Sequence, residues 1–380
     1  MVNSNANALG IIFPNSYDSL VPELVSERLM ASIPFAGRYR MVDFILSSMV
    51  NCGIDNISII VRKNYHSLMD HLGSGREWDL VRKNGGLNIV PPFAEKTVKV
   101  FNGRVEALAS ILDFLMDQKE KYVVMSDANI AVNFDFKSMI DAHIASGSDV
   151  TVAYKAEELP RSVIDSKNIH QDLYYTLDIK DGRVTELNIN EKADGIQNYS
   201  MNIYIIERTL LIEQIRNAYV HGYVYYERDI LTPQIQTLNV QAFEFKGYTA
   251  RICDMKAYFD ENMKLLKDEN LDALFSPNPI YTKIRDDNPT RYIEGAKAKN
   301  IMAADGCVIE GEVENSILFR GVKIAKGAVV KNCVLMQDTV IGEGAHVEYL
   351  ITDKNVTISA GKDVKGSDTY PFYVFKYQVI

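Results

Sequence analysis

The sequence predicts an α/β protein of two domains: a doubly wound, mostly parallel β-sheet, followed by a left-handed parallel β-helix of hexapeptide repeats. Two observations predict this architecture. In the first part of the chain, short apolar runs alternate with amphipathic helical segments, which is typical of a sheet covered by helices on both faces. Beyond about residue 300, apolar residues recur every six positions, which is typical of a β-helix. We therefore expect one domain over residues 1–268, and a linker with the β-helix over residues 269–380.

Four short, β-branched runs bounded by turn residues have the character of buried strands. They are residues 8–13, 56–61, 122–126 and 149–154. Between them, apolar residues at helical spacing predict helices over 42–50 and 105–116. Ligands of such sheets bind beyond the carboxyl ends of the strands, so we expect a site at the loops after Phe13 and Met125.

The six-residue period of the second domain is visible as two neighbouring columns of apolar residues. One column is Val322, Ala328, Val334 and Val340; the other is Ile317, Val329, Leu335, Ile341 and Val347. Ordinary strands joined by turns are the alternative interpretation. Prolines, aspartates and asparagines over 276–279 and 285–291 mark a linker before this domain. A coil with open ends often pairs with other chains, so we expect an oligomer.

Composition and charge narrow the classes of function. Of 380 residues, 47% are hydrophobic and 24% are charged, as in folded globular proteins. Against 50 Asp and Glu there are 41 Lys and Arg, and the net charge of −9 argues against a nucleic-acid or membrane partner. The start of the chain lacks a signal-peptide pattern. The four cysteines are far apart and suit packing roles in a reducing compartment, so we expect a cytoplasmic protein.

Four segments, in order along the chain, resemble those of a known enzyme family. They are residues 33–40 (IPFAGRYR), 41–54 (MVDFILSSMVNCGI), 64–80 and 247–266. Together they resemble the sugar-nucleotide pyrophosphorylases, and among these the bacterial glucose-1-phosphate adenylyltransferase, also called ADP-glucose pyrophosphorylase. The resemblance implies attack of glucose 1-phosphate on ATP, which yields ADP-glucose and pyrophosphate. Such a transfer needs positive charge around the phosphates.

The resemblance also implies that the nucleotide site of this chain is degenerate. The Arg of the family's phosphate loop corresponds to Leu20, beside Asp18, and the family's Lys corresponds to Met30. The two Asp residues that hold Mg²⁺ in the family correspond to Ala128 and Arg251. An Arg about 5 Å from Mg²⁺ would cost on the order of 6 kcal/mol at an effective dielectric constant near 20.

Other positions keep the family's residue types. Asp127 and Asp254 are neighbouring carboxylates that could replace the missing metal ligands. A substrate-like pocket for a sugar phosphate is implied for Arg28, Phe101, Gly103, Glu191, Lys192, Ser200 and Met201.

Three functions remain in competition. The first is a regulatory, non-catalytic D-type subunit without an intrinsic cofactor, in a tetramer with a catalytic glucose-1-phosphate adenylyltransferase subunit. Mg²⁺ would then be needed only at the partner's site, and a sugar phosphate or nucleotide effector would act on this chain. The second is a slow but active adenylyltransferase that uses Asp127 and Asp254. The third is a hexapeptide acyltransferase with His346 as its base, or a structural scaffold.

Overall fold

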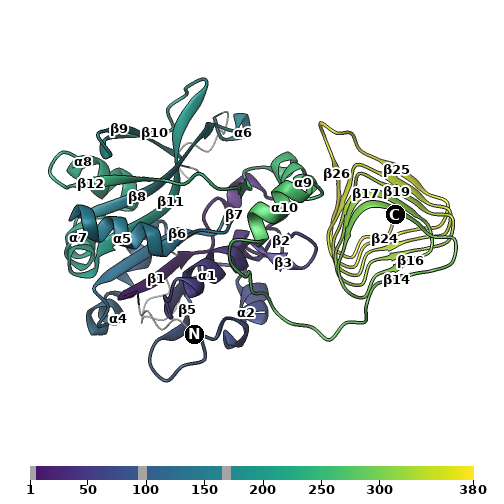
Figure 1. Ribbon diagram of the computed structural model, residues 1–380, viewed down its shortest axis with the longest axis horizontal. Helices are drawn as coiled ribbons and strands as arrows, with labels where there is room; N and C mark the ends of the chain where they lie inside the picture. The colour runs from purple at the N-terminus through teal and green to yellow at the C-terminus, as the bar shows by residue number, and fades with distance from the viewer. Residues whose placement is uncertain (1–5, 93–100, 165–172) are drawn as a thin grey trace.

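A sheet domain and a β-helix lie side by side in the computed structural model, which describes residues 6–92, 101–164 and 173–380 (Figure 1). A nine-stranded mixed sheet forms the centre of the first domain. In spatial order its strands are β5 (Gly86–Val90), β4 (Asn56–Ile60), β1 (Ala8–Phe13), β6 (Tyr122–Asp127), β11 (Ile196–Glu207), β8 (Val150–Glu158), β12 (Val240–Glu244), β10 (Arg183–Ile189) and β9 (Tyr175–Lys180).

Parallel pairing joins the four strands β5, β4, β1 and β6, and also β8 with β12. The long strand β11 is antiparallel to both of its main neighbours, β6 and β8, so the sheet changes direction at its centre. All four predicted strands are present. The doubly wound α/β class is confirmed, with parallel order concentrated in the half that contains the chain's first strand.

Two apolar cores on opposite faces of the sheet explain why its strands are so hydrophobic. Alternate side chains of a strand point to opposite faces, so Leu9 and Ile11 enter one core while Ala8 and Ile12 enter the other. The first core also contains side chains of α3, α4 and α7, and the second contains those of α1 and α5. Both faces are therefore covered by helices, as the composition of these strands requires.

The helices of the first domain are mostly short. They are α1 (Met41–Asn51), α2 (His66–Leu72), α3 (Arg104–Ala109), α4 (Leu112–Asp117), α5 (Phe136–Ser146), α6 (Arg161–Ile164), α7 (Arg208–Val220), α8 (Thr232–Gln234), α9 (Met255–Lys264) and α10 (Asp268–Phe275). Three 3₁₀ turns, η1 (Asp18–Leu20), η2 (Met30–Ser32) and η3 (Arg76–Trp78), and a π-helix, η4 (Tyr226–Leu231), complete the set. Two small strand pairs, β2 (Pro34–Phe35) with β3 (Tyr39–Arg40) and β7 (Ile130–Val132) with β13 (Thr249–Arg251), lie outside the main sheet.

The single helix predicted over 105–116 is wrong, because the structure has two helices there. The break lies at Ser110 and Ile111, between α3 and α4. The Ser110 hydroxyl donates to the Ala107 carbonyl at 2.7 Å, and a serine that bonds local backbone in this way competes with regular helix bonding.

The second domain is a parallel β-helix, as the sequence predicts. Its strands are β14 (Arg291–Tyr292), β15 (Lys297–Ala303), β16 (Val308–Ile309), β17 (Glu312–Leu318), β18 (Lys323–Ile324), β19 (Val329–Lys331), β20 (Val334–Leu335), β21 (Val340–Ile341), β22 (His346–Glu348), β23 (Leu350–Thr352), β24 (Thr357–Ile358), β25 (Asp363–Lys365) and β26 (Phe372–Val374). Every pair in it is parallel.

The coils of this β-helix do not keep a strict six-residue period. Stacked partners such as Ile324, Ile341 and Ile358 lie 17 residues apart, so each of these middle coils is one residue shorter than three repeats of six. The short corner contains Asn315, Asn332 or Tyr349 with a positive φ, which makes a tight turn. The predicted columns therefore drift from coil to coil.

Because of this drift, apolar residues of one predicted column face different sides of the coil. Val322 and Ala328 pack inside the coil, whereas Val334 and Ile317 of the same columns pack outside it, in a third core. That third core contains side chains of both domains, among them Tyr258 of α9 and Met336 of the β-helix. The two domains thus share one continuous apolar contact.

The chain leaves the sheet domain later than residue 268. Helix α10 packs on this domain, where the Phe275 ring lies 5.0 Å from that of Tyr39 and 5.9 Å from that of Phe44. Residues 276–290 then run along the domain to β14, and the Asn51 amide bonds the Pro279 carbonyl at 2.8 Å. The four cysteines are free and buried, in agreement with packing roles. No helix among the described residues has the length and apolar character to span a membrane.

Candidate functional site

A cavity that we call the larger cavity lies at the carboxyl ends of β1 and β6, where the sheet topology predicts a ligand. Its volume is about 750 Å³, enough for a small metabolite. The loops after β1 and β4, the start of α3, and η4 line it. Arg62 and Lys63 bring positive charge to the rim, and Asn15, Asn64 and Asn102 bring amide groups.

The hydrogen-bond donors around the loop after β1 bind a carboxylate of the same loop, that of Asp18. The Asp18 carboxylate accepts a hydrogen bond from the Met30 backbone N–H at 2.8 Å and another from the Asn15 amide at 2.9 Å. Burial raises the pKa of Asp18, and these bonds offset only part of that rise. Groups that could bind a phosphate oxygen therefore bind a carboxylate of the protein itself.

Tyr17 connects this loop to the opposite side of the cavity through two hydrogen bonds of its hydroxyl. It has a positive φ of 66°, which costs a residue of this type on the order of 1–3 kcal/mol. Its hydroxyl donates to the Leu173 carbonyl at 2.8 Å and accepts from the Asn202 amide at 2.7 Å. Burial raises the pKa of this phenol well above its ordinary value, so the phenol remains neutral.

A mostly buried guanidinium, that of Arg104, occupies the inner end of the cavity. Arg104 Nη2 lies 2.6 Å from Asp127 Oδ1, and Nη1 bonds Glu227 Oε1. Burial alone would lower the pKa of Arg104, but the carboxylates of Asp127 and Glu227 raise it well above its ordinary value. The arginine is therefore fully charged, and it compensates the two acids around it.

The oxygen donors present do not fit the Mg²⁺ site that the resemblance implies. Asp127 is paired with Arg104, and Ala128 packs in an apolar core. The carboxylate of Asp254 caps α9, where Oδ1 accepts from the Ala257 N–H at 2.6 Å. Within the described residues, no group of three or more His, Cys, Asp or Glu side chains could hold a metal ion.

Arg251 is held in a buried position rather than on the surface. Its guanidinium lies over the Tyr199 ring at 3.8 Å, and Nη2 is 3.2 Å from Glu157 Oε1. Burial lowers its pKa, but Tyr199 and Glu157 together raise it above the ordinary value. A second fixed positive charge therefore stands where the resemblance places a metal-binding acid.

The predicted substrate-like residues do not form one pocket. Among the described residues of that set, Gly103 alone lines the larger cavity. Phe101, Ser200 and Met201 are buried in the protein, while Glu191 and Lys192 are exposed on the connection between β10 and β11. The structure therefore does not bring this set of residues together around the larger cavity.

Two other degenerate positions are explained by packing. Met30 belongs to the core that both domains share, and Leu20 packs beside a small apolar cluster near α6. An apolar side chain stabilises each of these environments, whereas a charged one would not. His346, the base of the acyltransferase alternative, lies on β22 with Nδ1 3.9 Å from Asp363 Oδ1.

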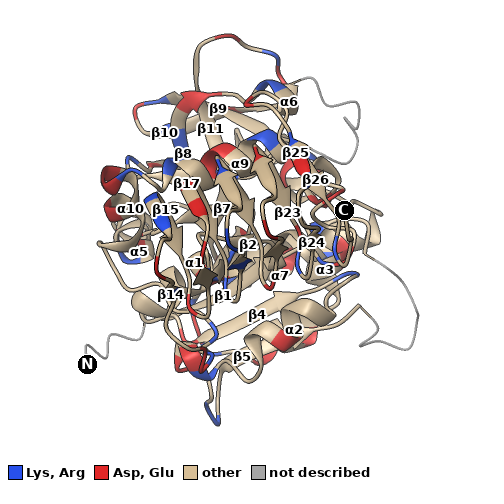
Figure 2. Cartoon of the chain, turned by 90° about the vertical axis from the view of Figure 1, so that its right-hand side faces the viewer, with Lys and Arg blue, Asp and Glu red and all other residues tan. Residues whose placement is uncertain are grey.

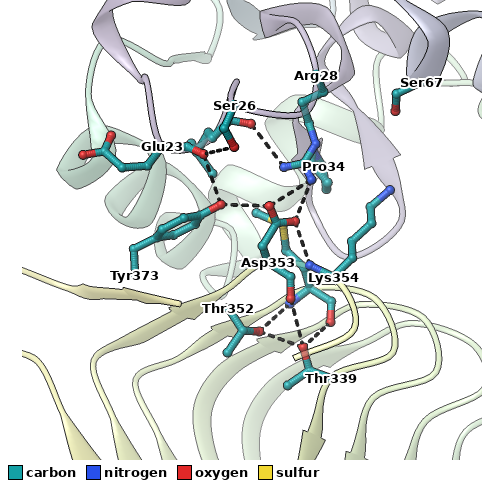
Figure 3. Close-up of polar contacts among 12 residues, drawn as sticks. Glu23, Ser26, Arg28, Pro34, Ser67, Thr339, Thr352, Asp353, Lys354 and Tyr373 are labelled. Atoms are coloured by element: carbon teal, nitrogen blue, oxygen red, sulfur yellow. Dashed lines mark hydrogen bonds and ion pairs between the residues drawn. The ribbon is translucent and has the colours of Figure 1, made fainter. Parts of the chain in front are cut away.

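Arg28 links the two domains instead of binding a ligand in the cavity. Its Nη2 lies 2.6 and 2.9 Å from the two carboxylate oxygens of Asp353, which belongs to the β-helix (Figure 3). The Tyr373 hydroxyl donates to the same carboxylate at 2.9 Å. The expected role of Arg28 in the substrate-like pocket is therefore replaced by an interdomain ion pair that is almost completely buried.

A second cavity, of about 190 Å³, lies beside this ion pair between the two domains. Six of its lining residues are basic: Arg38, Arg40, Lys283, Arg285, Arg320 and Lys354. Elsewhere on the face drawn in Figure 2, acidic and basic segments are interspersed rather than gathered into large regions of one sign. We call this second space the cationic cavity.

The charges of the cationic cavity are only partly compensated. Burial and the neighbouring cations lower the pKa of Lys354 to about 7, and burial lowers that of Arg40 to about 10. Among the described residues, no carboxylate pairs with the Lys354 ammonium, whereas Lys283 lies 3.3 Å from Asp70. A partly buried excess of positive charge of this kind favours an anion.

Sequence reasoning missed the cationic cavity because its basic residues come from four distant segments, at 38–40, 283–285, 320 and 354. The only local signals are the two arginines of 38–40 and the two basic residues of 283–285. Neither signal stands out among 41 Lys and Arg.

The fold and its main cavity define a nucleotidyltransferase-type protein with an appended hexapeptide β-helix. The family described as "Nucleotidyl transferase" matches residues 23–266, and that described as "GlmU-like, C-terminal hexapeptide" matches residues 284–371. The chain belongs to the nucleotidyl transferase family, in the group that contains the GlgD glycogen biosynthesis proteins and the glucose-1-phosphate adenylyltransferases.

Relatives of both kinds are similar over most of their length. The glycogen biosynthesis protein GlgD of Bacillus subtilis (strain 168) is 34% identical over 374 residues, which cover 98% of this chain and 96% of that protein. GlgD of Geobacillus stearothermophilus is 36% identical over 332 residues, 86% of this chain and 83% of that protein. The glucose-1-phosphate adenylyltransferase of Thermosipho africanus (strain TCF52B) is 31% identical, with 86% of this chain and 78% of that protein covered.

Proposed function

We propose that this chain is a regulatory subunit of glucose-1-phosphate adenylyltransferase in glycogen synthesis, assembled with a catalytic subunit in a tetramer. The observation on which the proposal depends is the Arg104–Asp127 ion pair at the inner end of the larger cavity. It leaves a guanidinium at the carboxyl end of β6, where a catalytic relative needs room for phosphate and metal. The similarity to two glycogen biosynthesis proteins, GlgD, supports the part of the proposal that concerns glycogen synthesis.

We further propose that an anionic effector, a sugar phosphate or a nucleotide, regulates the assembly through the cationic cavity. The compensation that Lys354 and Arg40 lack within the chain would come from phosphate oxygens. Because this cavity is lined by both domains, an anion there would favour one arrangement of the domains over others. That preference is what a regulatory subunit would transmit to its partner.

A paired assay tests the proposal. ADP-glucose synthesis is measured for this chain alone, for the catalytic subunit from the same organism alone, and for the two co-expressed. We expect no turnover by this chain, and a change of about fivefold or more in the partner's activity or effector affinity, since allosteric couplings of 1–3 kcal/mol have that size. Lys354→Met should weaken the effector response, whereas Lys326→Met, at an exposed site on the β-helix, should not.

Two results would contradict the proposal. An unchanged partner in the co-expressed sample would exclude a regulatory role. Turnover by the isolated chain that Asp127→Ala abolishes would instead identify a slow adenylyltransferase.

A further inference from the structure

We propose that Arg104 is a built-in cation, whose guanidinium occupies the anionic end of the larger cavity and excludes divalent metal ions from it. The inference deepens the proposed function, because it gives a physical reason for the lost metal site. Its test measures metal binding by this chain, whereas the proposed function is tested on the partner's activity, so the two can fail separately.

The first support is the burial of the two acids. Asp127 ends β6 and Glu227 lies in η4, and their side chains are 1% and 4% exposed. Two buried carboxylates in one place need a compensating cation, because a charge without a partner in the interior is very costly. Arg104 contacts both of them through separate nitrogens, so a single side chain supplies that cation.

The second support is the fixed position of the guanidinium. It lies 5.0 Å from the centre of the Phe13 ring and 5.7 Å from that of Tyr204, at cation–π distance. The backbone before it is held as well, since a Cβ on Gly103 would lie 2.3 Å from the Val224 carbonyl oxygen. The two rings and the two carboxylates therefore hold the guanidinium at the inner end of the cavity.

The third support is the set of oxygens around the guanidinium. The Ser16 hydroxyl donates to Asp127 Oδ1 at 2.6 Å, and the Tyr175 hydroxyl lies 3.4 Å from Glu227 Oε2. Asp127 Oδ2 is buried and accepts no hydrogen bond from any described residue. Carboxylate and hydroxyl oxygens are the donors that Mg²⁺ and Mn²⁺ prefer, so a metal ion and Arg104 compete for one place. Because Arg104 is part of the chain, its guanidinium is always present at this place and excludes the metal ion.

The test removes the built-in charge and asks whether a metal ion replaces it. Mn²⁺ binding to the full chain is measured by calorimetry and by the shift in Tm. The wild type and Arg104→Lys should show no binding that depends on Asp127. Arg104→Gln should melt at lower temperature without metal, and saturating Mn²⁺ should raise its Tm by about 5 °C or more. Adding Asp127→Asn to Arg104→Gln should abolish that rise.

A second variant tests the same proposal if Arg104→Gln does not fold. Arg104→Gln with Glu227→Gln removes one buried cation and one buried anion together, so the net charge of the group is unchanged. Mn²⁺ should stabilise this chain as well, in a manner that depends on Asp127. The proposal is overturned if the wild type binds Mn²⁺ through Asp127, or if no folded Arg104 variant gains Mn²⁺ binding.

Discussion

At the scale of the single residue, the Lys354 ammonium should make stability depend on pH. Its pKa in the folded chain is about 7, because burial and the nearby Arg40 and Arg28 lower it more than Asp353 raises it. An unfolded lysine has a pKa near 10.4. Between these values the unfolded chain holds one more proton than the folded chain, so this group stabilises the fold as pH rises above 7. Below pH 7 both states hold the proton, and the partly buried ammonium destabilises the fold to its full extent.

Melting temperatures from pH 6.5 to 9.5 would measure the effect. The wild type should gain stability with pH across this range, and Lys354→Met should gain less over the same range. Lys326→Met, an exposed lysine of the β-helix, should follow the wild type. Equal pH slopes for Lys354→Met and the wild type would show that Lys354 is not destabilised by its surroundings.

The sequence predicted which functional residues of the family are replaced at single positions. It did not predict which residues the replacements contact. The resemblance implied that Arg251 replaces a metal-binding acid and Met30 a lysine, and in the structure both side chains are buried and have definite neighbours. Arg104 was overlooked as a cation because its partners Asp127 and Glu227 are 23 and 123 residues away in the chain. Arg28 was misplaced for the same reason, since its carboxylate lies in the other domain.

At the scale of the element, the strands of the sheet were predicted more accurately than the helix over 105–116 or the residue spacing of the β-helix. Buried parallel strands need short continuous apolar runs, and β1 has the predicted bounds as a result. The helix over 105–116 was predicted from its apolar stripe alone. Such a stripe does not show that the Ser110 hydroxyl bonds the backbone where the helix is interrupted. In the β-helix, the spacing of five at one corner follows from positive-φ residues such as Asn332, a backbone property that a column of apolar letters does not show.

Helix α9 offers a test of one element and of one predicted metal ligand together. Asp254→Ala removes the bond to the Ala257 N–H, and a lost N-cap costs about 1 kcal/mol of the free energy of unfolding. Asp254→Asn should keep most of this stability, because asparagine also caps helices well. Urea denaturation measures both. Asp260→Ala, within an exposed pair with Lys256 on the same helix, should change little. A loss as large in Asp254→Asn as in Asp254→Ala would argue against the capping role.

At the scale of the whole molecule, the two domains are joined by apolar and ionic contacts together. The shared core contains residues of α9 and of the outer face of the β-helix, while the Arg28–Asp353 pair and the cationic cavity lie next to each other between the domains. An anion bound near Lys354 would therefore act close to the main polar contact between them. Neither feature could be predicted from the sequence, because each forms only where the two domains meet.

The Arg28–Asp353 pair should contribute strongly to this docking. Asp353→Asn leaves the Arg28 guanidinium buried without its counter-ion, and breaking a buried pair costs about 3–5 kcal/mol. Adding Arg28→Met removes the stranded charge and should recover much of that loss. Urea denaturation measures stability, and limited proteolysis of the 276–290 linker reports separation of the domains. Asp363→Asn, at an exposed acid of the same β-helix, is the matched control. If Asp353→Asn unfolded and was cleaved no more readily than Asp363→Asn, the pair would not hold the domains together.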